Sequence, residues 1–98
     1  MLRYEFEWDD EKARFNERKH GVAFDEARSC FLDLFAIESF DVDHSLDEDR
    51  FVIMGKSERG HLLVVAFTLR EQTTIRITSA REARRQERLD YEKQVDSR

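Results

Sequence analysis

The opening of the chain changes its hydrophobic period, which predicts a strand followed by a helix. Over Arg3–Trp8 every second residue is aromatic, an alternation typical of a strand with one buried face. Asp9 then suits a helix N-cap, and the acidic residues after it favour the positive end of the helix dipole. The helix is expected to end at Lys19 or His20, because Gly21 is a typical residue just beyond a helix C-terminus.

Further apolar segments predict a second helix, four more strands and a final helix. They are a helix over residues 25–32, strands over 34–40, 51–55, 62–69 and 73–78, and a helix over 80–94. Ser79 and Glu82 have the spacing of a capping box, which sets the start of the last helix at Ala80. The acidic stretch 41–49 predicts a loop. This order indicates an α+β fold with two N-terminal helices, an antiparallel sheet of four to five strands and a C-terminal helix.

The length and composition indicate a single domain spanning residues 1–98. Of its residues 40% are charged, yet eight phenylalanines and one tryptophan supply apolar area for a core, so disorder is expected only in the last few residues. The longest apolar run, Leu62–Phe67, is too short to span a membrane, and the opening MLRYEFEWDD does not resemble a signal peptide. The single cysteine, Cys30, suits a small buried side chain and a reducing cytoplasm.

Positive charge is concentrated in two segments of a chain whose formal net charge is -5. Acidic residues dominate 38–49, whereas cations gather over 12–20 and 76–88. On the predicted last helix, arginines at helical spacing form a stripe of Arg81, Arg84 or Arg85, and Arg88. The simplest interpretation of the stripe is a solvated face balanced by neighbouring glutamates. Arg76 and Arg81 differ, because they flank a predicted helix N-terminus, which favours anions and therefore predicts a phosphate site.

The first predicted helix carries a polar face with Lys12, Asn16 and Lys19 at helical spacing and His20 beside them. In one interpretation Asn16 is solvent exposed, and Lys19 and His20 only complement the helix C-terminus. In the other, His20 takes part in proton transfer. Tyr91 on the last helix also has two interpretations, since it can pack in the core or use its phenol to contact a base or a phosphate.

The acidic stretch DVDHSLDED does not have the spacing of a calcium site. Leu46 stands where an EF-hand requires glycine, and Val52 stands where it requires glutamate. The sequence also has no paired Cys/His zinc spacing, no phosphate-cradling glycine loop and no serine-elbow motif. We therefore expect neither a metal nor a cofactor.

Motifs spread over residues 6–91 resemble the BrnT family, which are toxins of type II toxin–antitoxin pairs. The resemblance rests on Phe6-x-Trp8-Asp9-x-x-Lys12, Asn16-x-x-Lys19-His20-Gly21-Val22-x-Phe24-x-x-Ala27, Phe31-x-Asp33, Glu48-x-Arg50, Gly55, Arg76-Ile77-x-Ser79-Ala80-Arg81 and Glu87-Arg88-x-x-Tyr91. One departure is visible: Thr78 stands where isoleucine is usual, and threonine fits a strand equally well.

The resemblance implies a RelE-like fold and a ribonuclease toxin that halts translation by cutting RNA without a catalytic metal. It also implies a BrnA-type antitoxin with a ribbon-helix-helix DNA-binding part. The complex of the two would bind its own promoter, so the toxin would meet operator DNA only through the antitoxin.

Such cleavage needs cations at the phosphate and groups that move two protons, and the resemblance and the charge pattern together assign residues to these roles. The scissile phosphate is expected to be held by three arginines, Arg76, Arg81 and Arg50. Proton transfer is expected from Lys19 or His20, and positioning of a nucleotide from Tyr91. Further RNA contacts are expected from Lys12, Arg84 and Arg88.

Two other functions remain open at this point. A catalytically inactive toxin-like module would only pair with the antitoxin in promoter repression, and normal growth of bacteria that express the chain alone would indicate it. A DNA-binding regulator would place its basic helix in a groove of duplex DNA, although the acidic residues on that helix oppose such contact.

Overall fold

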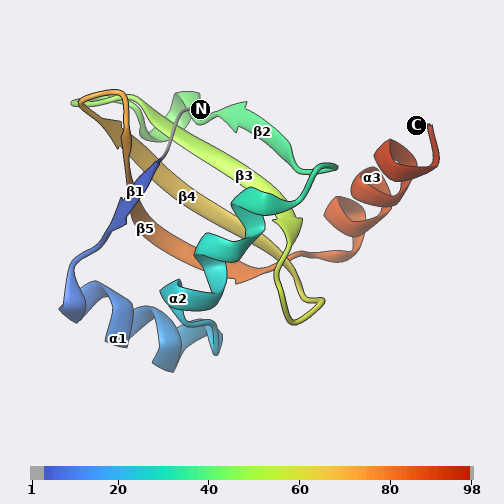
Figure 1. Ribbon diagram of the computed structural model, residues 1–98, viewed down its shortest axis with the longest axis horizontal. Coiled ribbons are helices and arrows are strands. Elements are labelled where there is room, and N and C mark those ends of the chain that lie inside the picture. The colour runs from blue at the N-terminus through green and yellow to red at the C-terminus, as the bar shows by residue number, and fades with distance from the viewer. Residues whose placement is uncertain (1–3, 98) are drawn as a thin grey trace.

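A five-stranded sheet forms the centre of the protein, in a computed structural model that describes residues 4–97 (Figure 1). Its strands are β1 (Glu5–Glu7), β2 (Ile37–Phe40), β3 (Arg50–Lys56), β4 (Leu62–Arg70) and β5 (Thr74–Glu82). Their order is β1-β5-β4-β3-β2, and neighbours are antiparallel except β1, which runs parallel to β5. Arg3, the first residue of the predicted opening strand, lies outside the described residues.

The α+β class and the element order are confirmed, whereas the expectation of a wholly antiparallel sheet is wrong. The exception is β1, and a parallel pair needs a long crossover between its strands. Here the connection from β1 to β5 contains the first two helices and the other three strands. The sequence pattern indicated each strand but carried no information on the direction in which β1 joins the sheet.

Within residues 4–97 three α-helices accompany the sheet. They are α1 (Asp10–His20), α2 (Phe24–Ala27) and α3 (Arg85–Asp96), with short 3-10 helices at Arg28–Leu32 and Val42–His44. α1 is bounded as predicted: the Asp9 carboxylate accepts the Lys12 N–H at 2.9 Å, and Gly21 follows the helix with a φ of 72°. The helix predicted over residues 25–32 is divided between α2 and the first 3-10 helix. No helix in this range is both long and apolar enough to cross a bilayer.

The last helix begins later than predicted, because β5 continues through the expected Ser79–Glu82 capping box. This segment pairs with β4 to its end. A helix starting at Ala80 would have left buried backbone groups of β4 without partners, and that cost exceeds the preference of a local capping pattern. α3 begins instead at Arg85. The Glu87 side chain accepts the N–H of the N-cap residue Arg84 at 2.7 Å and so caps the start of the helix. The helix extends to Asp96, close to the C-terminal end where disorder was expected.

The two faces of the sheet are covered by different helices. α1, α2 and the first 3-10 helix pack on what we call the first face, over a main core that includes Phe24, Val65, Phe67 and Ile77. α3 packs on one end of the second face, in a smaller cluster of Met54, Leu62 and Tyr91. Figure 1 shows α3 at the C-terminal end of β5, apart from α1 and α2. The opposite end of the second face carries the polar residues of the candidate site.

A β-bulge at Thr78 brings Arg76 and Arg81 onto the second face together. Arg76 lies opposite Thr68 and Arg81 opposite Val64, and these two β4 residues share a face because they are an even number of positions apart. The register shifts in the middle of the β4–β5 ladder, where β5 contains one residue more than β4. Without the bulge, the alternation of β5 would send the two arginines to opposite faces.

Candidate functional site

Four residues on four neighbouring strands form a row across the second face. Arg50 on β3 lies opposite Thr68 on β4, and Thr68 lies opposite Arg76 on β5. Arg76 in turn lies opposite Glu7 on β1. Residues directly opposite one another point to the same face, with Cβ atoms roughly 5 Å apart. We call these four residues the cross-strand row, and it places a guanidinium on each side of a hydroxyl, with a carboxylate at one end.

The carboxylate of Glu7 binds two arginines. Arg76 donates to it at 2.8 Å, and Arg70 donates to the same oxygen at 3.2 Å. The hydrogen bond from Arg76 is the main cause that lowers the pKa of Glu7, and the charge of Arg70 adds to it while burial opposes it. Glu7 is therefore ionised at neutral pH. Arg76 makes this contact through one nitrogen, which leaves its remaining N–H donors free to bind a ligand.

Thr68 has a buried hydroxyl that finds no hydrogen-bond partner in the described part of the chain. The residue is 2% exposed, and it lines a cavity of about 330 Å³ with Arg50, His44 and acidic residues of the 41–49 loop. The Arg50 guanidinium forms no ion pair or hydrogen bond with any of residues 4–97. A buried hydroxyl without a partner costs about 1–3 kcal/mol, so this cavity is a candidate binding site.

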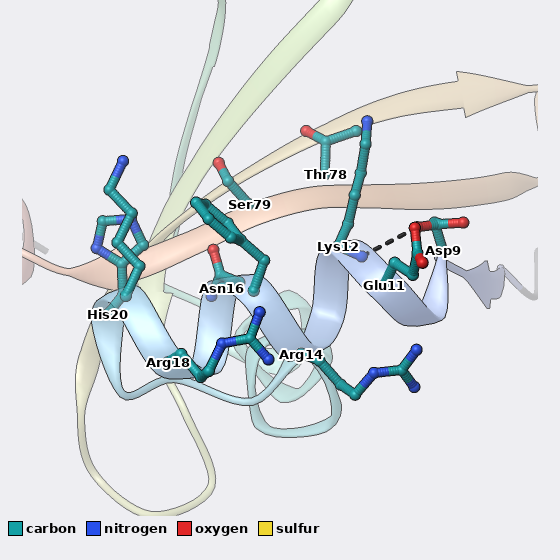
Figure 2. Close-up of a pocket in the computed structure, with 11 residues that line it drawn as sticks. Asp9, Glu11, Lys12, Arg14, Asn16, Arg18, His20, Thr78 and Ser79 are labelled. Atoms are coloured by element: carbon teal, nitrogen blue, oxygen red, sulfur yellow. Dashed lines mark hydrogen bonds between the residues drawn. The ribbon is translucent and has the colours of Figure 1, made fainter.

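A larger pocket of about 670 Å³ lies between α1 and β5 and is lined by all four residues singled out on the first helix, Lys12, Asn16, Lys19 and His20. Figure 2 shows Lys12 and His20 toward its two ends, with Ser79 of β5 between them. Phe15 is 58% exposed, and the Lys19 ammonium lies 5.8 Å from the centre of its ring. We call this the α1 pocket; it combines cations with an exposed aromatic ring, and no residue that lines it belongs to the cross-strand row.

Asn16, predicted on the same polar face, is buried and joins α1 to β5. Its amide nitrogen donates to the carbonyls of Val22 at 3.0 Å and Ala80 at 2.8 Å, and its oxygen accepts the Ala80 N–H at 3.0 Å. β1 pairs with β5 only as far as Arg76. Beyond that residue, the Asn16 amide supplies hydrogen-bond partners for the backbone edge of β5. The interpretation of Asn16 as a solvent-exposed residue is wrong, since it is 4% exposed.

Arg81 belongs to β5, so the prediction that Arg76 and Arg81 flank a helix N-terminus is wrong. Two nitrogens of Arg81 donate to the Glu87 carboxylate of α3, each at 2.8 Å, and this contact lowers the pKa of Glu87 to about 2. Along the ladder the β4 partners of Arg81 and Arg76 are four positions apart, roughly 13 Å of backbone. Each arginine binds a different carboxylate, so the structure does not bring the two together.

Tyr91 is a core residue of α3, 4% exposed, and its hydroxyl donates to Asp33 at 2.6 Å. Burial and this hydrogen bond both raise the pKa of Tyr91. The environment matches the packing interpretation of this residue. Arg84 and Arg88 are exposed at the start of α3, but the predicted stripe is interrupted because Arg81 lies on the strand.

The sequence pattern does not predict three residues that lie in the row or beside it: Glu7 and Thr68 belong to the row, and Arg70 binds Glu7. Alternation in the first strand puts Glu7 on the side opposite Phe6 and Trp8. That signal shows that Glu7 faces away from the core, but only the pairing of β1 with β5 shows that it lies beside Arg76. No local motif marks Thr68, which follows an apolar run.

Comparison with known proteins identifies the family. The profile of the family described as "Ribonuclease toxin, BrnT, of type II toxin-antitoxin system" matches residues 8–87. The structure is similar to the 1.1 Å crystal structure of the Brucella abortus ribonuclease toxin BrnT, with 21% sequence identity and a TM-score of 0.61. The match covers 87% of this chain and 100% of that chain, and it shows a shared fold. No curated protein matches the chain. Since the family profile spans most of its length, the chain belongs to the BrnT family of type II toxin–antitoxin systems.

Proposed function

We propose that this chain is an active endoribonuclease that cuts RNA without a metal ion and thereby inhibits translation. In the proposed reaction the ribose 2′-OH attacks the adjacent phosphate, a base removes its proton, and an acid protonates the departing 5′-oxygen. Cations stabilise the charge that develops on the phosphorane, which is commonly the largest catalytic contribution. The observation that carries the proposal is the cross-strand row, because it supplies cations, a hydroxyl donor and a carboxylate on one surface.

The scissile phosphate fits above Thr68, between Arg50 and Arg76. Neighbouring strands are roughly 4.8 Å apart, so the backbones of the two arginines are separated by about two such spacings, a gap that two long side chains and a phosphate can fill. Guanidinium groups bind phosphate oxygens in a bidentate manner and keep their protons. The Thr68 hydroxyl would donate to a phosphate oxygen and so gain the partner that it lacks.

Glu7 is the proposed base for the 2′-OH. It is ionised because Arg76 and Arg70 donate to it. When a bound phosphate draws Arg76 away from Glu7, the hydrogen bond that lowers the pKa of Glu7 weakens. The carboxylate then becomes a stronger base at the moment when the substrate is in place.

We propose that the α1 pocket binds nucleotides of the RNA that lie away from the cleaved bond. Lys12 and Lys19 supply cations for neighbouring phosphates, His20 offers an imidazole that can hydrogen-bond to them, and the exposed ring of Phe15 offers a surface on which a base can stack. This assignment keeps Lys12 as an RNA contact. It changes Lys19 and His20 from proton transfer to binding, because neither lines the cavity that holds Arg50 and Thr68.

The remaining predicted residues lie toward the α3 end of the second face. Arg84 and Arg88 are exposed and stay predicted RNA contacts. For Arg81 and Tyr91 we favour a supporting role, since their polar groups are bound to Glu87 and Asp33. Both would hold α3 on the sheet, and their substitution would lower stability more than cleavage.

The family implies an antitoxin partner. We propose that this partner is a BrnA-type protein with a ribbon-helix-helix DNA-binding part, and that the complex represses its own operon. The toxin would meet operator DNA only through the antitoxin. The formal net charge of -5 supports a complex in which the antitoxin contacts the DNA, because a chain of this charge does not favour non-specific contact with duplex DNA.

Expression of the chain alone in bacteria tests the proposed function. We expect arrest of growth, together with RNA fragments that end in a 2′,3′-cyclic phosphate, because the 2′-oxygen is the nucleophile. The purified chain should give the same ends in the presence of a metal chelator. Normal growth and intact RNA would instead favour a module that only binds its antitoxin.

A further inference from the structure

We propose that His44, which lies outside the residues assigned so far, is the general acid that protonates the departing 5′-oxygen. This assignment rests on the proposed function, because it supplies the second proton transfer that Glu7 cannot perform. The evidence comes from the 41–49 loop, where a histidine is held beside the β3 end of the cross-strand row.

One ring nitrogen of His44 is fixed by a carboxylate. Its Nδ1 lies 3.0 and 3.1 Å from the two oxygens of Asp41. Nε2 has no partner among residues 4–97, so it is free to exchange a proton with a ligand. A carboxylate on one nitrogen fixes the orientation of the ring, and imidazole is the side chain most often used for general acid–base catalysis.

The loop is anchored to the strand that carries Arg50. The Asp41 N–H donates to the Arg50 carbonyl at 2.8 Å, and the Arg50 N–H donates to the Ser45 hydroxyl at 2.9 Å. These bonds hold His44 on the short turn between Asp41 and Ser45. The histidine is therefore positioned relative to the strand even though its side chain is 64% exposed.

His44 shares a cavity with the phosphate site. It lines the same cavity of about 330 Å³ as Arg50 and Thr68, whose hydroxyl is buried and unpartnered. The charged groups that line this cavity from the loop and from β3 are Asp43, Asp47, Glu48 and Arg50. A phosphate above Thr68 would thus have Glu7 toward the β1 side and His44 toward the β3 side. Displacement in line at phosphorus requires a base and an acid on opposite sides of the phosphate, as this arrangement provides.

The proton and electron transfers balance without any additional reactant. Glu7 accepts the 2′-OH proton while the 2′-oxygen forms its bond to phosphorus. The bond from phosphorus to the 5′-oxygen breaks, and Nε2 of the His44 imidazolium gives its proton to that oxygen. The products are a cyclic phosphate and a 5′-hydroxyl, with Glu7 protonated and His44 neutral until solvent restores both.

A change of leaving group tests this role directly. Two short RNAs are compared under single turnover, one natural and one with sulfur in place of the 5′-bridging oxygen, because a thiolate leaves without being protonated. Variant His44→Ala should cut the natural RNA about 10²–10⁴-fold more slowly than the parent. It should cut the sulfur RNA at the rate of the parent, and the descending limb of its pH profile on natural RNA should be lost.

Matched controls separate this role from a structural one. His61→Gln removes another histidine bound to a carboxylate, Glu26 at 2.7 Å, and should leave both rates unchanged. If His44→Ala does not fold, His44→Gln carries the same comparison. Equal losses on both RNAs, or no loss on either, would overturn the assignment. Failure of the parent chain to cut natural RNA would instead overturn the proposed nuclease, and His44 with it.

Discussion

The two ends of the second sheet face carry the same kind of side chain in different states. At the end covered by α3, Arg81 gives two nitrogens to Glu87. At the other end, Arg76 gives one nitrogen to Glu7, and the Arg50 guanidinium has no partner within residues 4–97. A guanidinium that already binds a carboxylate through two nitrogens supports the fold, whereas one with free N–H donors can bind a phosphate. The difference lies in the partners and not in the residue type.

The largest expected contrast is between the two arginines of β5. Arg76→Ala should slow cleavage of a short RNA about 10²–10³-fold, the loss typical of removing one donor to a transition-state oxyanion. Its urea midpoint should stay close to that of the parent, since the contact with Glu7 is partly exposed and therefore screened by solvent.

Arg81→Ala, the matched variant, should show the reverse. Stability in urea should fall, because the contact that holds the start of α3 is lost, while the cleavage rate of the folded fraction stays near that of the parent. If Arg81→Ala slows cleavage as much as Arg76→Ala does, the division between the two ends is wrong, and the original expectation for Arg81 at the phosphate gains support.

On the first face, the side-chain amide of Asn16 has hydrogen-bond partners for both its nitrogen and its oxygen. Asn16→Ala removes three hydrogen bonds and leaves the buried Ala80 N–H without a partner. The free energy of unfolding should fall by about 2–3 kcal/mol. Glu17→Ala, an exposed neighbour on the same helix, is the control and should change stability little. Similar urea midpoints for the two variants would contradict the role of Asn16 as the link between α1 and β5.

Thr68→Val should change stability and cleavage in opposite directions. Valine has the shape of threonine and removes the buried hydroxyl that lacks a partner, so the protein should gain about 1 kcal/mol of stability. Cleavage should fall, because the phosphate loses one donor. A variant that is less stable than the parent would show that the hydroxyl has a structural partner, and unchanged cleavage would remove Thr68 from the site.

The smallest effect concerns the pH dependence of the Arg81–Glu87 contact. The pKa of Glu87 is lowered from its ordinary 4.5 to about 2, so its contribution to stability is present above pH 4.5 and is lost as pH falls toward 2. Glu87→Gln should be less stable than the parent by about 0.5–1 kcal/mol at pH 7, since both side chains are partly exposed. The two unfolding curves should converge as pH falls to 2; a constant difference would contradict the ion pair.

Local chemistry made part of this fold predictable from the sequence. The Asp9 cap and Gly21 fixed the bounds of α1, since a cap depends on residues a few positions apart. The last helix could not be placed the same way. The local sequence at the end of β5 has a capping pattern, but the same residues pair with β4. Pairing with β4 lowers the free energy more than an earlier helix start would, because it satisfies buried backbone groups.

The candidate site was less predictable, because it is built across strands. The positions of Arg50 and Arg76 could be singled out by charge, but their neighbours could not. Glu7 meets Arg76 only because β1 joins β5 in parallel, and Thr68 stands between the arginines only through the register of three strands. No sequence motif marks His44, because its position beside Arg50 depends on hydrogen bonds between the 41–49 loop and β3.

Whether Arg50 and Arg76 bind one phosphate, as proposed, can be measured with a double-mutant cycle. Single-turnover cleavage would be compared for the parent, Arg50→Ala, Arg76→Ala and the double variant. Residues that share one ligand should be coupled by about 0.5–3 kcal/mol, so the double variant should lose much less activity than the product of the single losses. Losses that multiply would show that the two arginines act on separate parts of the RNA and do not share a phosphate.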